Sequence, residues 1–181
     1  MDKEFLDVTA DNLIIIRDAR HALLSKTEPG EKTRIANAVF CRMLTICIVT
    51  STEFILEAWR TKSQVLEPYF ALPKNTPNPD RKRSLQKAFE EHWLDLEESV
   101  LDDYLAIKFM RNASVHLRWF SHEKDWVKLR NFPTDLTRFA MDDFDRMSKV
   151  YNKLAICIYQ TEFDDPSIRA YAAVLARKLA E

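Results

Sequence analysis

The chain has 181 residues, of which 46% are hydrophobic and 30% charged, and this composition is typical of a folded, soluble protein rather than a disordered one. A single glycine argues against β-barrels, β-sandwiches and phosphate-binding loops, because these need glycine for tight turns and close backbone approaches. The formal net charge of −1 gives no overall attraction for nucleic acid, although a local basic patch can still exist. We therefore expect one all-helical domain over residues 1–181.

The first part of the chain predicts two helices. Apolar side chains recur at helical spacing over residues 12–25, and Asp11 precedes them as a favourable N-cap. Pro29 and Gly30 then break the chain. Residues 32–64 are apolar on nearly every side in their middle, which is typical of a helix covered by others on several faces. We expect this second helix to lie at the centre of the fold.

Prolines dominate the next segment, at positions 68, 73, 77 and 79. Proline removes a backbone donor and restricts the residue before it, so we expect residues 65–80 to form an extended surface loop inside the domain. A lid or a contact with a partner protein is the other use that such a loop could have.

The rest of the chain predicts further helices over residues 81–93, 97–119 and 136–160, with a loop over residues 121–133. Asp165 followed by Pro166 is typical of a cap and a first turn, and predicts one more helix. Short connections between about five to six helices predict an all-α, up-and-down helical bundle.

The cysteines and the apolar runs indicate the compartment. Cys41, Cys47 and Cys157 form no paired spacing and are expected to be reduced and packed in the core. The N-terminal segment is acidic and has no apolar signal core. The most apolar run, residues 44–56, contains Glu53 and is too short to span a membrane. We expect a cytoplasmic protein without a membrane partner.

Metal and cofactor chemistry is not indicated. Histidines stand at positions 21, 92, 116 and 122, and none belongs to an HExxH motif. Glu90 and Glu91 adjoin His92, but a carboxylate metal bundle requires Glu-x-x-His pairs on facing helices. The cysteine spacing fits no zinc site, and no GxSxG or Cys–His nucleophile pattern is present. We expect no metal and no cofactor.

Polar residues interrupt the apolar helix predicted over residues 97–119, namely Lys108, Arg111, Asn112 and His116. Asn112 and His116 are one turn apart and share a face, whereas Arg111 is offset from His116 by about 140°. A buried, unpaired charge costs several kcal/mol, so these groups need a wet cleft or polar partners across a dimer interface. The alternative is that they are ordinary polar residues of a helix, because this spacing also arises by chance.

The order Arg111-Asn112-x-x-x-His116, late on a long apolar helix, resembles the signature of the HEPN superfamily, which is an all-α bundle. A weaker resemblance lies in residues 49–60, where small polar residues precede Glu53 and an apolar run. Glu53 matches the family's carboxylate in that helix. The resemblance covers about residues 35–158.

The resemblance implies a metal-independent endoribonuclease that forms a homodimer, with the Arg and His of two protomers lining one cleft. Many members are toxins held by an antitoxin, or effectors of antiviral defence with a partner protein. Other members are inactive and serve as dimerisation or protein-binding modules, and this alternative stays open. In one toxin group a tyrosine often follows the His by two positions. Arg118 stands there in this chain, which argues against that group.

The chemistry of RNA cleavage suits these residue types. The 2′-hydroxyl of RNA is the nucleophile, so cleavage requires proton transfers and stabilisation of charge on the phosphate. His116 can transfer protons near neutral pH, and Arg111 can hold two phosphate oxygens with its planar fork. Asn112 is expected to orient His116 or contact the phosphate. Glu53 is expected to pair with Arg111, and Lys108 to support the site.

Basic and aromatic residues that follow the motif suit single-stranded RNA, whose bases stack on rings. We expect contacts with RNA from Arg118, Trp119, Lys124 and Lys128. The alternative for Trp119, and for Trp126 further along, is that they pack the loop onto the bundle. A second basic cluster, residues 81–83, is interpreted as the solvated start of a helix.

Overall fold

The computed structural model describes residues 3–62, 64–73, 76–91 and 96–162, and it is all-helical over these ranges. The elements in chain order are α1 (Lys3–Leu24), α2 (Glu31–Lys62), the 3-10 turn η1 (Gln64–Leu66), α3 (Glu67–Phe70), α4 (Asn78–Glu91), α5 (Glu98–His116), α6 (Ser121–Leu129) and α7 (Asp143–Glu162). The predicted all-α class is confirmed, and the arrangement is compatible with a helical bundle. The helix predicted from Asp165 and Pro166 lies outside the described residues.

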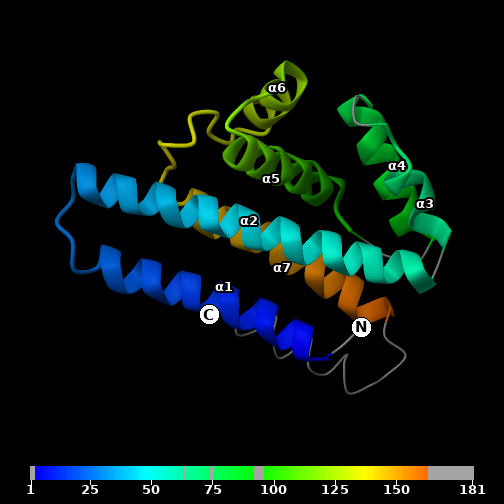
Figure 1. The fold of residues 1–181 in the computed structure, drawn as a ribbon, viewed down its shortest axis with the longest axis horizontal. Coiled ribbons are helices and arrows are strands. Elements are labelled where there is room, and N and C mark those ends of the chain that lie inside the picture. The colour runs from blue at the N-terminus through cyan, green and yellow to red at the C-terminus, as the bar shows by residue number, and fades with distance from the viewer. Residues whose placement is uncertain (1–2, 63, 74–75, 92–95, 163–181) are drawn as a thin grey trace.

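The long helix α2 is central, as its apolar middle predicts. It lies beside α1 and contacts both α5 and α7, while α4 and α6 contact α5 from the side away from α1 (Figure 1). Each of these helices therefore covers an apolar face of a neighbour, which is how a helical domain buries a core. The bounds of α2 agree with the predicted range of 32–64 within two residues.

By length and composition alone, α2 is also apolar enough to cross a membrane over Glu31–Thr61, with a mean hydropathy of 1.7. The shorter run that we considered from the sequence, residues 44–56, underestimates this length. Half of the most apolar stretch is buried inside the molecule, and core helices of soluble proteins have the same composition. Together with the contacts to α1, α5 and α7, this is compatible with a soluble protein.

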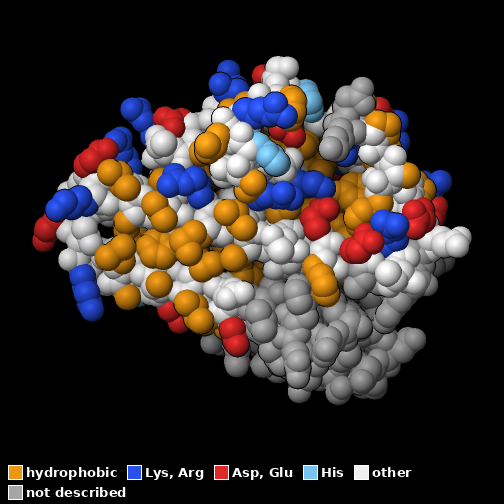
Figure 2. Space-filling model, viewed as in Figure 1, with side chains coloured by type: hydrophobic (Ala, Val, Ile, Leu, Met, Phe, Trp, Pro, Cys, Tyr) orange, Lys and Arg blue, Asp and Glu red, His pale blue; other side chains and the backbone are white. Residues whose placement is uncertain are grey.

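One side of α2 is not covered by the described helices. Ile35, Val39, Met43 and Ile46 are between 39% and 53% exposed, and their spacing places them in one row along the first half of the helix. We call these four residues the α2 stripe. Figure 2 shows hydrophobic side chains gathered over this part of the surface, on the same face that displays two histidines. Exposed apolar patches of this kind mark surfaces of interaction.

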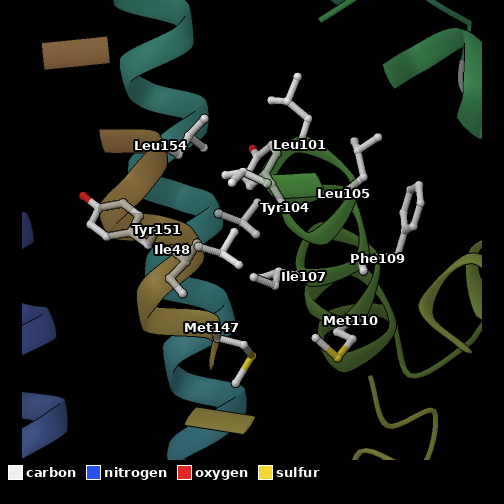
Figure 3. Close-up of a cluster of buried hydrophobic side chains, with 14 of the residues drawn as sticks. Ile48, Leu101, Tyr104, Leu105, Ile107, Phe109, Met110, Met147, Tyr151 and Leu154 are labelled. Atoms are coloured by element: carbon white, nitrogen blue, oxygen red, sulfur yellow. The ribbon is translucent and has the colours of Figure 1, made fainter. Parts of the chain in front are cut away.

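The core lies between α2, α5 and α7. Figure 3 shows Ile48 of α2 and Met147 of α7 facing the apolar side chains of α5. The α5 residues that are buried are Val100, Leu101, Tyr104, Leu105, Ala106, Ile107, Phe109, Met110 and Ala113. The apolar character predicted for the helix over residues 97–119 is confirmed as far as Ala113. Val115 and Leu117, by contrast, are 52% and 90% exposed, so the end of α5 emerges from the core.

The cysteines belong to this core and its edge. Cys41 is buried, Cys47 and Cys157 are half-buried, and all three are free thiols. Burial raises the pKa of Cys41 to about 12 and raises the pKa of Cys47 as well. Because the thiolate is the reactive form, neither Cys41 nor Cys47 is a reactive thiol at neutral pH.

The helix predicted to begin at residue 136 begins instead at Asp143. Side chains of the first two helices bind the backbone carbonyls of residues 136–141. Asn37 donates to the carbonyls of Phe139 and Ala140, and Arg42 donates to that of Leu136. Carbonyls used in this way do not accept the hydrogen bonds of a helix. Asp143 then caps the segment by accepting from the Ala140 amide at 2.7 Å.

Three other boundaries differ from the prediction. Residues 65–80 are not one extended loop, because η1, α3 and the start of α4 occupy most of them, and Pro68 and Pro79 are tolerated in first helical turns. The loop predicted over 121–133 contains α6, a helix too short to show clear periodicity. The first helix starts upstream of Asp11, since no proline or glycine interrupts residues 3–11.

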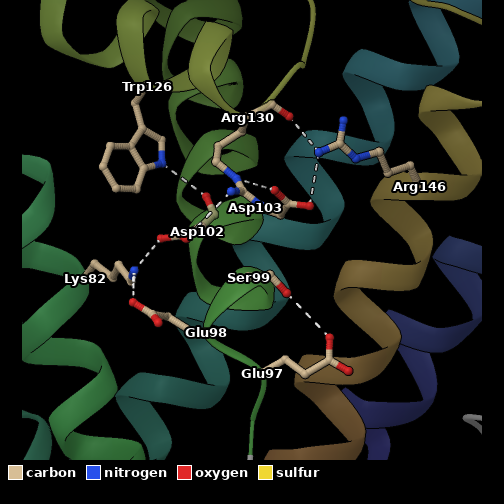
Figure 4. Close-up of polar contacts among 9 residues, drawn as sticks. All are labelled: Lys82, Glu97, Glu98, Ser99, Asp102, Asp103, Trp126, Arg130 and Arg146. Carbon is tan, nitrogen blue, oxygen red and sulfur yellow. Dashed lines mark hydrogen bonds and ion pairs between the residues drawn. The ribbon is translucent and has the colours of Figure 1, made fainter.

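A polar network joins the helices around α5 (Figure 4). Asp103 accepts from Arg130 at 2.8 Å and from Arg146 at 3.1 Å, and Arg146 also donates to the Arg130 carbonyl at 2.7 Å. At the preceding position, Asp102 pairs with Lys82 of α4, and its backbone carbonyl accepts a hydrogen bond from the Trp126 indole. Two adjacent aspartates therefore connect α5 to α4, α6 and α7.

We expect Asp103→Ala to lower the free energy of unfolding by about 2–3 kcal/mol, because it removes the carboxylate that binds two partly buried guanidinium groups. Arg130 then keeps only its longer contact with Asp102, at 3.8 Å. A fall of about 4–12 °C in Tm would accompany this loss, as measured by calorimetry. Glu91→Ala is the matched control, since it removes an exposed ion pair with Lys87 and is expected to cost under about 0.5 kcal/mol. Equal stability of the two variants would contradict the role given to Asp103.

Candidate functional site

The chain reverses direction just after the motif. α5 ends at His116 rather than at residue 119, because Leu117 adopts the left-handed conformation with φ of 52°. The chain then enters α6, which packs back on α5. Asn78 at the start of α4 donates to the His122 carbonyl at 2.9 Å and fixes the first turn of α6. The ends of α5 and the starts of α4 and α6 thus meet at one place.

A pocket of about 470 Å³ opens where these elements meet. Its lining residues are Tyr69, Arg81, Leu105, Lys108, Phe109, Asn112, His116, Arg118, Phe120, His122 and Glu123. Four residues singled out from the sequence are among them, namely Lys108, Asn112, His116 and Arg118. Asn112 and His116 share this pocket because they are one turn apart on α5.

Arg111 does not line this pocket, in accordance with its offset around the helix from His116. Its side chain is half-buried, and its Nε is buried without a hydrogen-bond partner among the described residues. Arg111 lies near Tyr104: burial raises the pKa of that phenol well above its ordinary value, and the Arg111 charge acts against this rise. The pocket thus joins His116 to Asn112 but not to Arg111 of the same chain.

Glu53 pairs with Lys108, and not with Arg111 as the sequence suggested. The Glu53 carboxylate accepts from Lys108 Nζ at 2.8 Å and from the Tyr104 hydroxyl at 2.6 Å. Lys108 also donates to the Tyr69 hydroxyl at 2.9 Å. Burial opposes the charge on Lys108, but Tyr69 and Glu53 together outweigh burial and raise the pKa of Lys108. Lys108 is therefore a fixed cation at the wall of the pocket.

The Asn112 side chain is held by a buried carboxylate of α6. Its Nδ2 donates to Glu123 Oε1 at 3.4 Å, and Glu123 is only 6% exposed. Glu123 was not singled out from the sequence, and α6 turns its side chain inward. With its amide nitrogen directed at Glu123, Asn112 presents its carbonyl oxygen on the other side.

Three exposed side chains form the rim of the pocket. The Arg118 guanidinium lies 4.9 Å from the centre of the Phe120 ring, and Phe120 stacks on His122 with centroids 5.9 Å apart and planes at 24°. Phe120 is 48% exposed. The sequence analysis considered His122 only as a metal ligand. Its stacking on Phe120 depends on the reversal of the chain at Leu117, which the sequence does not display.

The other residues expected to contact RNA lie outside the pocket lining. Trp119 is half-buried and packs against the core, and Trp126 does so too. The packing interpretation therefore describes both tryptophans. Lys124 and Lys128 are exposed on α6. In the basic cluster of residues 81–83, Arg81 lines the pocket although it was interpreted as solvated, whereas Arg83 points to solvent with 77% of its side chain exposed.

Over the described ranges, no group of three or more His, Cys, Asp and Glu side chains is arranged to hold a metal ion. The chemistry available in the pocket is that of two imidazoles, an amide, fixed cations and an exposed aromatic ring. No protein-family model matches this chain, and no curated protein or solved structure matches it either.

Proposed function

We propose that this protein is a HEPN-like, metal-independent endoribonuclease that works as a homodimer. The observation that carries the proposal is the pocket at the end of α5, where Asn112 and His116 of the motif lie together with the cations Lys108, Arg81 and Arg118. An imidazole beside fixed positive charge suits phosphodiester cleavage, which needs proton transfer and stabilisation of a phosphorane.

In the proposed reaction, the 2′-hydroxyl of RNA attacks the adjacent phosphorus, and the 5′-oxygen of the next nucleotide leaves. His116 removes the proton from the 2′-hydroxyl or delivers one to the leaving oxygen, and the cations stabilise the charge on the non-bridging oxygens. Asn112 orients the imidazole through its carbonyl oxygen, or contacts the phosphate through the second N–H of its amide. Arg118 lies at the rim of the pocket, while the exposed Lys124 and Lys128 extend the RNA-binding surface beyond it.

A homodimer would supply the groups that one protomer lacks. The pocket of each chain contains two imidazoles, those of His116 and His122, but not the guanidinium of its own Arg111. A twofold axis near the end of α5 would bring a second Arg111 and His116 to one composite cleft. The α2 stripe, with Val115 and Leu117, supplies exposed apolar surface for this contact.

We expect Met43→Glu to convert the dimer to a monomer, because it places a charge in the middle of the α2 stripe, where a partner would bury it. The molar mass is measured by sedimentation equilibrium, beside the wild type and Lys87→Glu as a control with an exposed side chain on α4. A wild-type monomer at high micromolar concentration would contradict the dimer, as would a Met43→Glu dimer of unchanged affinity.

The proposed biological role is that of a cytoplasmic toxin or antiviral-defence effector. An uncontrolled ribonuclease harms its own cell, so this role includes an antitoxin or defence-system partner that restrains it. The resemblance at Arg111, Asn112 and His116 supports this role, and no cofactor or membrane is part of it.

The second candidate function is an inactive, HEPN-like module for dimerisation or protein binding. Two observations favour it: Arg111 is outside the pocket, and the α2 stripe leaves apolar surface open to a partner. A module of this kind would bind through the same face without cleaving RNA.

The deciding experiment is incubation of purified protein with cellular RNA, including tRNA, in the presence of EDTA. We expect cleavage products with 2′,3′-cyclic phosphate ends, and their absence when His116→Ala protein replaces the wild type. Equal background cleavage by both proteins would exclude the ribonuclease and favour the binding module.

A further inference from the structure

The pocket contains two cations that are held in place by other residues and still have hydrogen-bond donors to spare. Lys108 Nζ donates to Glu53 and to Tyr69, which uses two of the three donors of an ammonium group. Arg81 donates through Nε to the Thr76 carbonyl at 3.2 Å and through Nη2 to the Pro73 carbonyl at 2.5 Å. Among the described residues, the third donor of Lys108 and the Nη1 group of Arg81 have no partner.

Such prearranged donors suit a phosphate. An anion that enters the pocket finds two positive groups whose side chains need little further ordering, so the entropy cost of binding is small. Lys108 has Glu53 as its counter-ion, whereas the printed partners of Arg81 are neutral backbone carbonyls, so the pair carries a net positive charge. Glu123 is the one carboxylate among the lining residues, and it is directed at Asn112. The guanidinium and ammonium groups would share the oxygens of one phosphate.

The rim supplies a surface for a base. Phe120 and His122 are stacked and exposed, and Arg118 covers part of the Phe120 ring. Nucleobases stack on aromatic rings and on guanidinium planes regardless of their sequence. The pocket volume of about 470 Å³ lies within the usual range for sites of small ligands, which is about 300–1,000 Å³.

We propose that this pocket is a nucleotide-binding subsite, in which Lys108 and Arg81 bind a phosphate and the Phe120–His122 pair stacks the attached base. The subsite belongs to the pocket on which the proposed ribonuclease function rests, and it assigns the phosphate of a single-stranded RNA chain to Lys108 and Arg81 rather than to Arg111 of the same protomer. Nucleotide binding does not need cleavage, so it is measurable by itself.

The test is calorimetric titration of adenosine 3′-monophosphate into the full-length protein and its His116→Ala variant, in EDTA. We expect both proteins to bind. Lys108→Met and Arg81→Met should each weaken binding at least tenfold, because each removes one charged partner of the phosphate. Arg83→Met is the matched control on the same basic cluster, and it should bind like the wild type because Arg83 is exposed and outside the pocket lining.

Stacking is tested by a second pair of measurements. Phe120→Ala should weaken the binding of adenosine 3′-monophosphate by about 5- to 150-fold, which is the usual value of one stacked base. The same variant should bind inorganic phosphate as the wild type does. If Phe120→Ala weakened the binding of inorganic phosphate as much as that of adenosine 3′-monophosphate, the division of the subsite into phosphate and base contacts would be wrong.

The outcomes separate this subsite from the ribonuclease. Binding that depends on Arg81, in a wild-type protein that leaves RNA intact, would support the subsite and exclude the enzyme. RNA cleavage with unchanged KM in Arg81→Met would overturn the subsite and leave the enzyme standing. Failure of the wild type to bind adenosine 3′-monophosphate at millimolar concentration would also overturn the subsite. Arg81→Met keeps the test decisive if Lys108→Met folds poorly, because Arg81 is outside the Glu53 network.

Discussion

Replacement of His116 by alanine is expected to lower the rate of RNA cleavage by about 10²–10⁴-fold, the usual contribution of general acid–base catalysis. His116 is exposed at the last turn of α5 and lines the pocket, so its removal takes away an imidazole without opening a cavity in the core. The thermal stability of the variant should therefore equal that of the wild type. Initial rates on a fluorogenic single-stranded RNA, with Tm from calorimetry, measure both quantities.

Two other histidines provide controls for this prediction. His21→Ala removes an exposed histidine of α1, outside the pocket lining, and should leave the rate unchanged. His122→Ala removes a pocket residue that stacks on Phe120, and should act mainly on KM, because it contributes to binding of the base. A His116→Ala rate equal to that of His21→Ala would remove His116 from the mechanism.

The sequence predicts a long, strongly apolar helix better than the short segments between helices. α2 was predicted within two residues because its pattern persists over many turns. α6 was missed because it has nine residues, of which only Trp126, Val127 and Leu129 are apolar. Residues 136–142 carry no signal of their own that prevents a helix. Their carbonyls are bound by Asn37 and Arg42, which are about a hundred positions away in the chain.

Within the candidate site, the sequence predicts the residues that share one helix but not those that other segments contribute. Asn112 and His116 come together by helical spacing alone, which the sequence displays. The partner of Glu53 was predicted wrongly, because Lys108 and Arg111 are neighbours on one helix and only packing decides which of them meets α2. Arg81 and Tyr69 reach the pocket from other segments, and their contribution depends on tertiary contacts that local pattern does not encode.

Replacement of Glu53 by glutamine should lower the stability of the folded protein. The carboxylate accepts hydrogen bonds from Lys108 and from the fully buried Tyr104 hydroxyl. An amide has the same shape but no charge, so the Lys108 ammonium stays in a mostly buried place without its counter-ion. We expect the free energy of unfolding to fall by about 2–3 kcal/mol. This is less than the loss at fully buried pairs, because both side chains remain partly exposed to solvent.

A double-mutant cycle measures the interaction between Glu53 and Lys108 separately from the other effects of each substitution on stability. Lys108→Met removes the ammonium, so adding Glu53→Gln to it should cost less than Glu53→Gln costs in the wild type. The difference is the coupling energy, which we expect to be about 1–2 kcal/mol for residues in direct contact. Urea unfolding of the four proteins at pH 7 gives the four free energies. Additive losses would mean that Glu53 acts through Tyr104 alone.

The same network makes the protein sensitive to alkaline pH. The pKa of Lys108 is raised above its ordinary value of 10.5 in the folded state, so its stabilising charge is fully present below that pH and is lost as the pH rises through the folded pKa. Burial raises the pKa of Tyr69 and of Tyr104, so deprotonation of these phenols is easier in the unfolded chain and acts in the same direction. The Glu53→Gln substitution removes the carboxylate that helps to keep Lys108 charged. The variant should therefore lose less of its remaining stability between pH 9 and pH 11 than the wild type does, and a larger loss would contradict the role of Glu53 as the counter-ion of Lys108.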